Sequence, residues 1–146
     1  MNAAGLSFPD ELHYLIEHQV WARLDADDVA TVGITTLGIA QTGEIYMCRP
    51  QTVGSAVEQG RSIAIVELAK AIVSVKSPVR GTVVAVNERL ETRPALVHLD
   101  PYGEGWIARV RLADFAADRA TLVHGAAVAA AMERYALLWE QEQRER

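Results

Sequence analysis

The sequence predicts a small, mainly β domain, a barrel or sandwich of short strands with helices at its periphery. Short alternating apolar and polar runs recur along the chain, separated by turns rich in Gly, Pro and Asp, a pattern typical of antiparallel strands. The length of 146 residues and the 50% hydrophobic content suit one domain with a substantial core. A proline-free, alanine-rich stretch near the end predicts an amphipathic helix. We therefore expect a single domain over residues 1–146, with its core at about 12–112 and its C-terminal helix at about 124–143.

The first half of the chain predicts a loose start followed by four strands. Met1–Asp10 is small and polar, which predicts a loose end. An acidic turn between two alternating runs predicts a hairpin over Val20–Ile34. Thr35 or Thr36 is placed to cap a short helix over Leu37–Thr42, which the following glycine ends. The strands expected in this half are Leu12–Ile16, Val20–Leu24, Val29–Ile34 and Glu44–Cys48.

The second half predicts four further strands and two helices. Asn87–Pro94 is polar and predicts a loop, and the glycine-rich Tyr102–Trp106 segment predicts a turn with Trp106 in the core. Asp114 is placed to cap a short helix over Phe115–Arg119. The strands expected here are Ile63–Val66, Ile72–Val75, Gly81–Val86 and Trp106–Leu112. The apolar face of the C-terminal helix is expected to contain Val128, Met132, Tyr135, Leu138 and Trp139.

Lys70 stands at the predicted tip between two closely spaced strands, Ile63–Val66 and Ile72–Val75. A flexible side chain on a short, braced loop suits a covalently attached carrier group, and an amine forms a stable amide with a carboxylic-acid cofactor. Of 14 basic residues only Lys70 and Lys76 are lysines, although arginine is a near-equivalent solvated charge. A requirement for an amine at the tip explains this choice, and an ordinary polar turn residue is the alternative.

Charge and composition exclude several classes of function. The net charge of −5 argues against nucleic acid binding, since no basic patch is available for phosphates, but it is compatible with docking onto a basic protein surface. Cys48 is the only cysteine, so no intramolecular disulfide can form, which suits a reducing compartment. The start of the chain lacks the features of a secretory signal and no run is long enough to span a membrane. We therefore expect a cytoplasmic protein with no membrane partner.

Neither a catalytic site nor a metal site is indicated by the sequence. The four histidines lack the spacing of metal ligands; they are His13, His18, His98 and His124. No nucleophile–base pair, catalytic pair of carboxylates or glycine-rich phosphate loop stands out. The chemistry is therefore expected to belong to a bound cofactor and to partner enzymes.

Four blocks of sequence resemble the glycine cleavage system H protein family, in the order and spacing of that family. The segment Val66–Ala71, followed by Ser77–Gly81, resembles its lipoylation hairpin. The other three blocks are Ala30–Thr35, Val86–Leu90 and Asp100–Trp106. Together the four blocks extend roughly from Glu17 to Leu112, which is most of the chain.

The resemblance implies a fold, a cofactor and partners. The implied fold is a flattened lipoyl-type hybrid barrel-sandwich of two antiparallel sheets, with short helices and the hairpin at one end. The implied protein is a carrier rather than an enzyme, with lipoate attached covalently to Lys70 as a swinging arm. The resemblance implies that lipoylating enzymes recognise Glu67. Alternatively, Glu67 is an ordinary carboxylate at the end of a strand.

The hairpin has two alternative interpretations. Biotin carriers, the nearest rival with this fold, resemble one another in having methionines on both sides of the lysine, whereas Ala69 and Ala71 flank Lys70 here. An unmodified protein-interaction module, in which the hairpin is only structural, is the remote alternative.

One part of the sequence departs from the family pattern. In the family, the cleft that holds the loaded arm contains two acids and an imidazole. The corresponding positions here are assigned to Gln19 or Val20, to Ser74 and to Leu37, with His18 as a further cleft residue. A neutral lining stabilises a cation less than a carboxylate does, so this cleft suits an uncharged or anionic sulfur adduct.

The neutral cleft resembles that of an H-like branch of the family. These are lipoate-binding proteins associated with heterodisulfide-reductase-like oxidation of sulfur compounds in bacteria. The resemblance implies a sulfur-oxidation carrier, with the heterodisulfide-reductase-like complex as its partner. The alternative is an H protein that carries an aminomethyl group between the glycine cleavage enzymes.

Overall fold

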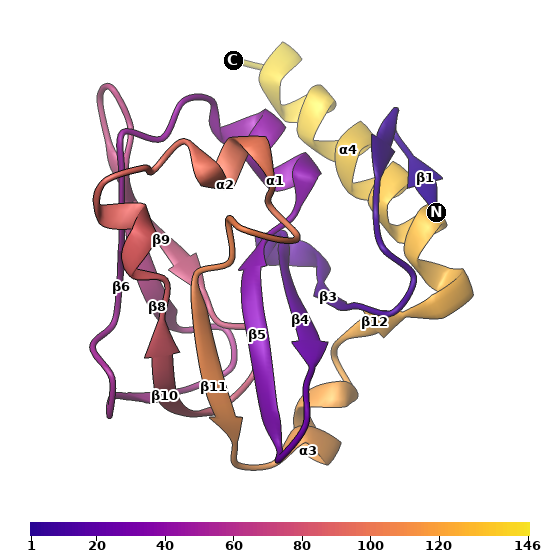
Figure 1. Ribbon diagram of the computed structural model, residues 1–146. Coiled ribbons are helices and arrows are strands. Elements are labelled where there is room, and N and C mark those ends of the chain that lie inside the picture. Colours follow the sequence, from indigo (N-terminus) through magenta and orange to yellow (C-terminus); the bar gives the residue numbers. More distant parts are fainter.

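The computed structural model describes the whole chain, residues 1–146, as three antiparallel sheets with α-helices at the periphery (Figure 1). A seven-stranded sheet has the order β12-β3-β4-β5-β11-β10-β7, a three-stranded sheet has the order β6-β8-β9, and β1 and β2 form a separate hairpin. The strands are β1 Asn2–Ala3, β2 Leu6–Ser7, β3 His13–Leu15, β4 Val20–Leu24, β5 Val29–Ile34, β6 Met47–Pro50, β7 Ala56–Val57, β8 Ser62–Glu67, β9 Ile72–Lys76, β10 Gly81–Val86, β11 Ala108–Leu112 and β12 Val123–His124. The α-helices are α1 Thr36–Thr42, α2 Leu96–Leu99, α3 Phe115–Arg119 and α4 Val128–Arg144, and the 3-10 helices are η1 Ile16–His18, η2 Glu88–Glu91 and η3 Gly125–Ala127.

The hairpin predicted over Val20–Ile34 is confirmed as β4–β5, and it lies at the centre of the seven-stranded sheet. Val20 of β4 pairs with Ile34 of β5. Asp27 and Asp28 adopt positive φ in the connecting turn, which aspartate tolerates better than most residues. The acidic turn therefore fixes the register of the hairpin that carries one wall of the site described below.

Two hydrophobic cores lie on opposite faces of β4. Val20 and Ala22 belong to the larger core of 21 buried residues, whereas Trp21 between them belongs to a smaller core of eight. This alternation follows from the two-residue repeat of a strand. The smaller core also contains Val128 and Met132 of α4, so α4 and the N-terminal hairpin cover that face of β4 (Figure 1).

The start of the chain is not the loose end that its composition predicts. Phe8 is fully buried in the smaller core, and its backbone N–H donates to the carbonyl of Met1 at 2.8 Å. The backbone N–H of Ala4 donates to Oε1 of Glu133 on α4 at 2.6 Å. One buried aromatic residue and these bonds order a segment that is otherwise small and polar.

The strand predicted over Glu44–Cys48 is displaced along the chain. Its residues before Met47 form a connection, and β6 extends to Pro50. The backbone N–H of Ile45 donates to Nε2 of His98 on α2 at 2.9 Å instead of to a neighbouring strand. Cys48 is buried within β6, and burial raises the pKa of its thiol to about 12, which confirms its predicted role as a small apolar residue.

The fully buried tryptophan of the core is Trp21, and not Trp106 as the sequence predicts. Trp21 is fully buried, and its Nε1–H donates to the carbonyl of Ile34 at 3.1 Å. Trp106 is half-buried at the edge of the smaller core, with the Arg109 guanidinium 4.0 Å above its ring. Strand β11 begins at Ala108, two residues later than predicted.

The C-terminal helix is confirmed as amphipathic, although it begins later than residue 124. Val123 and His124 pair with β3 before η3 leads into α4. Met132 is fully buried, but Leu138 is 48% exposed, so the last turns of α4 have no core beneath that residue. No helix in the structure combines the length and apolar character needed to cross a membrane.

Candidate functional site

Lys70 lies at the exposed tip of the β8–β9 hairpin, as predicted. Glu67 pairs with Ile72 at the last rung of the hairpin, and the backbone N–H of Leu68 donates to the carbonyl of Ala71 at 2.8 Å. Four residues therefore close the turn, and Lys70 projects from it without a salt bridge. The tip extends from the end of the molecule opposite α3 (Figure 1).

The base of the hairpin is rigidly held. Ser77 is fully buried just after β9, and its Oγ donates to the carbonyl of Val79 at 2.6 Å. Arg80, which follows Val79, is bound to the carboxylate of buried Asp118. Its backbone N–H donates at 2.7 Å and its Nε–H donates at 2.9 Å. The lysine is thus a flexible side chain on a fixed support, which is the arrangement that a carrier arm requires.

A cleft of about 130 Å³ opens along β9 next to the hairpin tip. Its walls come from β9 and β8 on one side, from η1, β4 and α1 on the other, and from α4. His18, Gln19 and Ser74, three of the predicted arm-cleft residues, all line it. Ser74 is only two residues beyond Ile72, about 7 Å along the strand, so the cleft lies close to the turn that contains Lys70.

Gln19 shapes the floor of the cleft through bonds to its neighbours. Its amide is almost completely buried and fully engaged: Oε1 accepts from Oγ1 of Thr35 at 2.6 Å, and Nε2 donates to the carbonyl of Ile16 at 2.9 Å and to Sδ of Met132 at 3.4 Å. Gln19 also has a positive φ of 51°. This residue therefore positions the cleft walls, and its amide has little capacity left for a ligand.

The prediction that Leu37 lines the cleft is wrong. Leu37 is buried in the smaller core, and Gly38 and Gln41 of α1 line the cleft instead. At 3.6 residues per turn, Leu37 lies about a quarter turn from the centre of the cleft-facing side of α1. A Cβ on Gly38 would lie 2.9 Å from Cγ2 of Ile34, so only glycine allows α1 to pack this closely.

Two polar atoms of the cleft have no partner within the protein. Nε2 of Gln41 and Oγ of Ser74 are both buried without a hydrogen bond, whereas buried polar atoms are normally paired. Val66 and Val73 add apolar wall beside them. The cleft therefore offers apolar wall and two free hydrogen-bonding atoms to a group that enters it.

Glu67 lies three residues before Lys70 and is half-exposed. Its carbonyl accepts a hydrogen bond from the backbone N–H of Tyr46 at 2.8 Å, and its side chain forms no salt bridge. The carboxylate is therefore available to a partner that approaches the tip. Its role in recognition by lipoylating enzymes stays a prediction.

Gln41 and Tyr135 are among the cleft residues that the sequence did not indicate. Gln41 is a polar residue on a short helix of otherwise small or apolar residues, and its position one turn beyond Leu37 was the available signal. Tyr135 reaches the cleft from α4, and local sequence carries no signal for a contact between segments so far apart.

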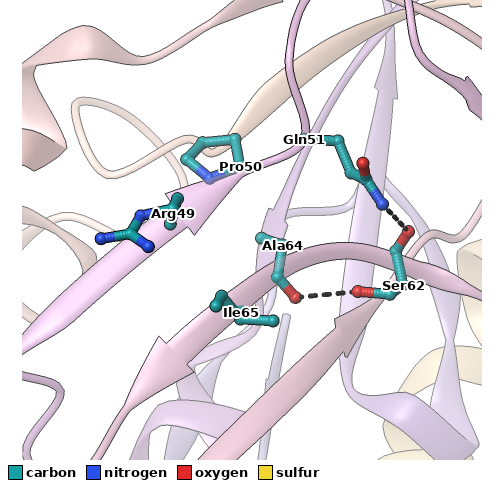
Figure 2. Close-up of a pocket in the computed structure, with 6 residues that line it drawn as sticks. All are labelled: Arg49, Pro50, Gln51, Ser62, Ala64 and Ile65. Atoms are coloured by element: carbon teal, nitrogen blue, oxygen red, sulfur yellow. Dashed lines mark hydrogen bonds between the residues drawn. The ribbon is translucent and has the colours of Figure 1, made fainter.

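A shallow pocket on the β6–β8 pair lies at the other end of the three-stranded sheet. Figure 2 shows the residues that line it, which are Arg49, Pro50, Gln51, Ser62, Ala64 and Ile65. Two internal hydrogen bonds hold it, from Nε2 of Gln51 to the carbonyl of Ser62 and from Oγ of Ser62 to the carbonyl of Ala64. Because Ser62 pairs with Lys76 at the base of the hairpin, this pocket is remote from Lys70.

The site and fold together define a carrier protein, in which an exposed lysine on a fixed hairpin lies beside a cleft. The family model described as "Glycine cleavage H-protein" matches residues 12–135. The chain belongs to the glycine cleavage H-protein family. Members of this family are carriers rather than catalysts and hold lipoate covalently on a lysine.

Individual relatives agree with this assignment. Glycine cleavage system H protein 2 of Aquifex aeolicus is 37% identical over 131 residues, which are 90% of this chain and 81% of that protein. The H protein of Marinobacter nauticus is 42% identical over 106 residues, covering 73% and 81% of the two chains. The crystal structure of the Mycobacterium marinum H protein has a TM-score of 0.66, 29% identity, and coverage of 72% and 86%. The expected mainly β barrel-sandwich with short helices and a C-terminal helix is thereby confirmed.

Proposed function

We propose that Lys70 is the lipoyl attachment site of this carrier. The observation that carries the proposal is the position of an exposed, unpaired lysine on the hairpin tip, beside a cleft with two unsatisfied polar atoms. Lys76, the only other lysine, lies at the base of the same hairpin opposite Ser62. An arm attached there would start at the end of β9 remote from the exposed tip.

The arm serves the glycine cleavage enzymes in this proposal, and it carries an aminomethyl group between them. The names of the relatives support this reading over sulfur oxidation. Lipoylating enzymes install the cofactor, and Glu67 is the residue that they contact beside the lysine. Bound lipoate supplies the sulfur chemistry, while the chain holds the arm, presents it to partners and shelters its head.

Within the cleft, Gln41 and Ser74 are the residues that contact the head of the arm. An amide and a hydroxyl each offer both a donor and an acceptor. Their oxygens accept hydrogen bonds from a protonated amine, and their hydrogens are donated to an anionic adduct. The cleft is therefore neutral and adaptable instead of being committed to a cation by a carboxylate.

A sulfur-compound carrier is the second candidate, and one observation favours it. None of the 12 residues that line the cleft is acidic, so no carboxylate stabilises an aminomethyl cation there. An uncharged or anionic sulfur adduct needs no carboxylate for its stabilisation, so the lack of an acidic residue does not destabilise it. In that case the partner is a heterodisulfide-reductase-like complex.

A reconstituted glycine cleavage reaction with lipoylated protein distinguishes the two candidates. Turnover comparable to that with a conventional H protein supports the glycine cleavage role. Failure to turn over, together with faster loss of ammonia and formaldehyde from a preformed aminomethyl adduct, supports the sulfur role. Ser74→Asp places a carboxylate in the cleft and should slow that loss, whereas Gln51→Glu, on the remote pocket of Figure 2, should leave it unchanged.

A further inference from the structure

Tyr135 forms part of the cleft wall from a helix that is remote in the sequence from the lipoyl hairpin. It lines the cleft together with Val73 and Ser74 of β9 and Gln41 of α1. The C-terminal helix thus takes part in the site, besides covering the smaller core.

The position of Tyr135 is fixed by contacts one turn earlier in α4. Met132 is fully buried, and its Sδ accepts a hydrogen bond from Nε2 of Gln19, the residue that forms the cleft floor. Residues three apart on a helix lie on the same side, so Tyr135 follows Met132 along the face that meets the cleft. The hydrogen bond between Gln19 and Met132 thereby fixes the position of α4 relative to the floor of the cleft.

The Tyr135 hydroxyl differs from the other tyrosine hydroxyls near the smaller core. The hydroxyl of Tyr14 donates to the carbonyl of Pro9 at 2.7 Å, and that of Tyr102 donates to the carbonyl of Ser7 at 3.0 Å. Tyr135 is half-buried, and its hydroxyl has no such structural bond. Burial, and then Glu142, raise the pKa of the Tyr135 phenol, so it stays protonated and able to donate at neutral pH.

We propose that Tyr135 closes the cleft over the sulfur-bearing head of the lipoyl arm. Its ring covers the sulfur atoms, a favourable contact for a polarisable group, and its hydroxyl is a third neutral hydrogen-bonding group beside those of Gln41 and Ser74. Tyr135 is thus a positioning residue that controls how long a load stays sheltered. This inference rests on the proposed attachment of lipoate to Lys70.

Thiol alkylation of the reduced, lipoylated protein tests the inference directly. The full chain is loaded with lipoate, reduced, and treated with iodoacetamide, and the rate of alkylation on the arm is followed by mass spectrometry. Tyr135→Ala should accelerate alkylation several-fold. Tyr46→Ala, which removes an exposed tyrosine outside the cleft, should leave the rate unchanged. The Lys70→Arg protein gives the background from the buried thiol of Cys48.

A second variant tests the Tyr135 hydroxyl in a protein that keeps the aromatic ring and its packing. Tyr135→Phe keeps the ring and should keep the wild-type melting temperature, yet it should shorten the lifetime of an adduct on the arm. Tyr14→Phe removes a structural bond to the carbonyl of Pro9 outside the cleft, so it should lower the melting temperature without changing that lifetime.

The outcomes separate this inference from the proposed function. Arm alkylation at the wild-type rate in folded Tyr135→Ala would overturn the role of Tyr135 alone. If Tyr135→Ala does not fold, an unchanged adduct lifetime in Tyr135→Phe would overturn it instead. Alkylation no greater than the Lys70→Arg background in the wild type would show that no arm is attached, and would overturn the proposed function as well.

Discussion

Oγ1 of Thr35 donates a 2.6 Å hydrogen bond to Oε1 of Gln19. The same Thr35 oxygen accepts from the backbone N–H of Gly38 at 3.0 Å, as the N-cap of α1. One buried hydroxyl therefore joins the start of α1 to the floor of the arm cleft. The N-cap of α1, which the sequence predicts, and the tertiary contact that orients Gln19 therefore share one oxygen atom.

Thr35→Val should lower the free energy of unfolding by about 1–3 kcal/mol, because it removes the cap and leaves the buried Gln19 oxygen without its donor. Thr35→Ser keeps the hydroxyl and should lose much less. Urea denaturation of both variants measures the difference. Equal losses in the two variants would show that the methyl group matters and the hydroxyl does not.

Lys70→Ala should abolish carrier function and change the free energy of unfolding by no more than ~0.5 kcal/mol, since the side chain packs against nothing. Trp21→Ala should cost ~3–5 kcal/mol, because it empties a fully buried site. Trp106→Ala, at a half-buried position, should cost roughly 1–2 kcal/mol. Urea melts rank the three, and a loss at Lys70 comparable to that at Trp21 would make Lys70 a structural residue.

His13 makes the stability depend on pH. It is buried, stacked on His124 with ring centroids 4.0 Å apart, and its Nδ1 has no hydrogen-bond partner. Burial, then the charges of His124 and Arg119, lower its pKa to about 4. The unfolded chain therefore binds this proton more readily than the folded one, and stability present above pH 6.5 is lost as the pH falls towards 4.

The expected loss from His13 is about 2–3 kcal/mol across that interval. His13→Phe should flatten the dependence of the unfolding free energy on pH, because the ring remains and the proton site does not. His18→Gln, which changes a more exposed histidine, should keep the wild-type dependence. Urea melts at several pH values make the comparison, and identical curves for wild type and His13→Phe would refute the account of His13.

The lysine hairpin was predictable from the sequence because its information is local. Two β runs and a four-residue turn determine where Lys70 projects. The cap at Asp114 was also predictable, since a helix start depends on a few adjacent residues: Oδ1 of Asp114 accepts from the backbone N–H of Ala117 at 3.2 Å. Both features need no knowledge of the rest of the fold.

The cleft was only partly predictable because its walls come from different parts of the chain. His18 and Ser74 line the cleft, but Leu37 is buried in the smaller core while Gly38 and Gln41 of α1 reach the cleft. Which residues of α1 face the cleft depends on the distant segments against which the helix packs, and local sequence does not contain that information. Tyr135 depends on the docking of α4. That docking is set by buried residues such as Met132, whose partner Gln19 lies over 100 residues earlier.

The N-terminal segment shows the same limit of local composition. Small and polar residues predict a loose end, yet Phe8 enters the smaller core. Its burial depends on Trp21 and Val128, which bring the rest of that core together. Whether a single aromatic residue orders such a segment therefore depends on the tertiary structure around it.

Peptide mass spectrometry of protein produced with lipoylating enzymes tests the central claim most directly. The matched variants are Lys70→Arg and Lys76→Arg, which remove each of the two lysines in turn and keep the charge. The account predicts a lipoyl adduct on Lys70 in the wild type and in Lys76→Arg, and none in Lys70→Arg. An adduct on Lys76, or no adduct on the wild type, would contradict it.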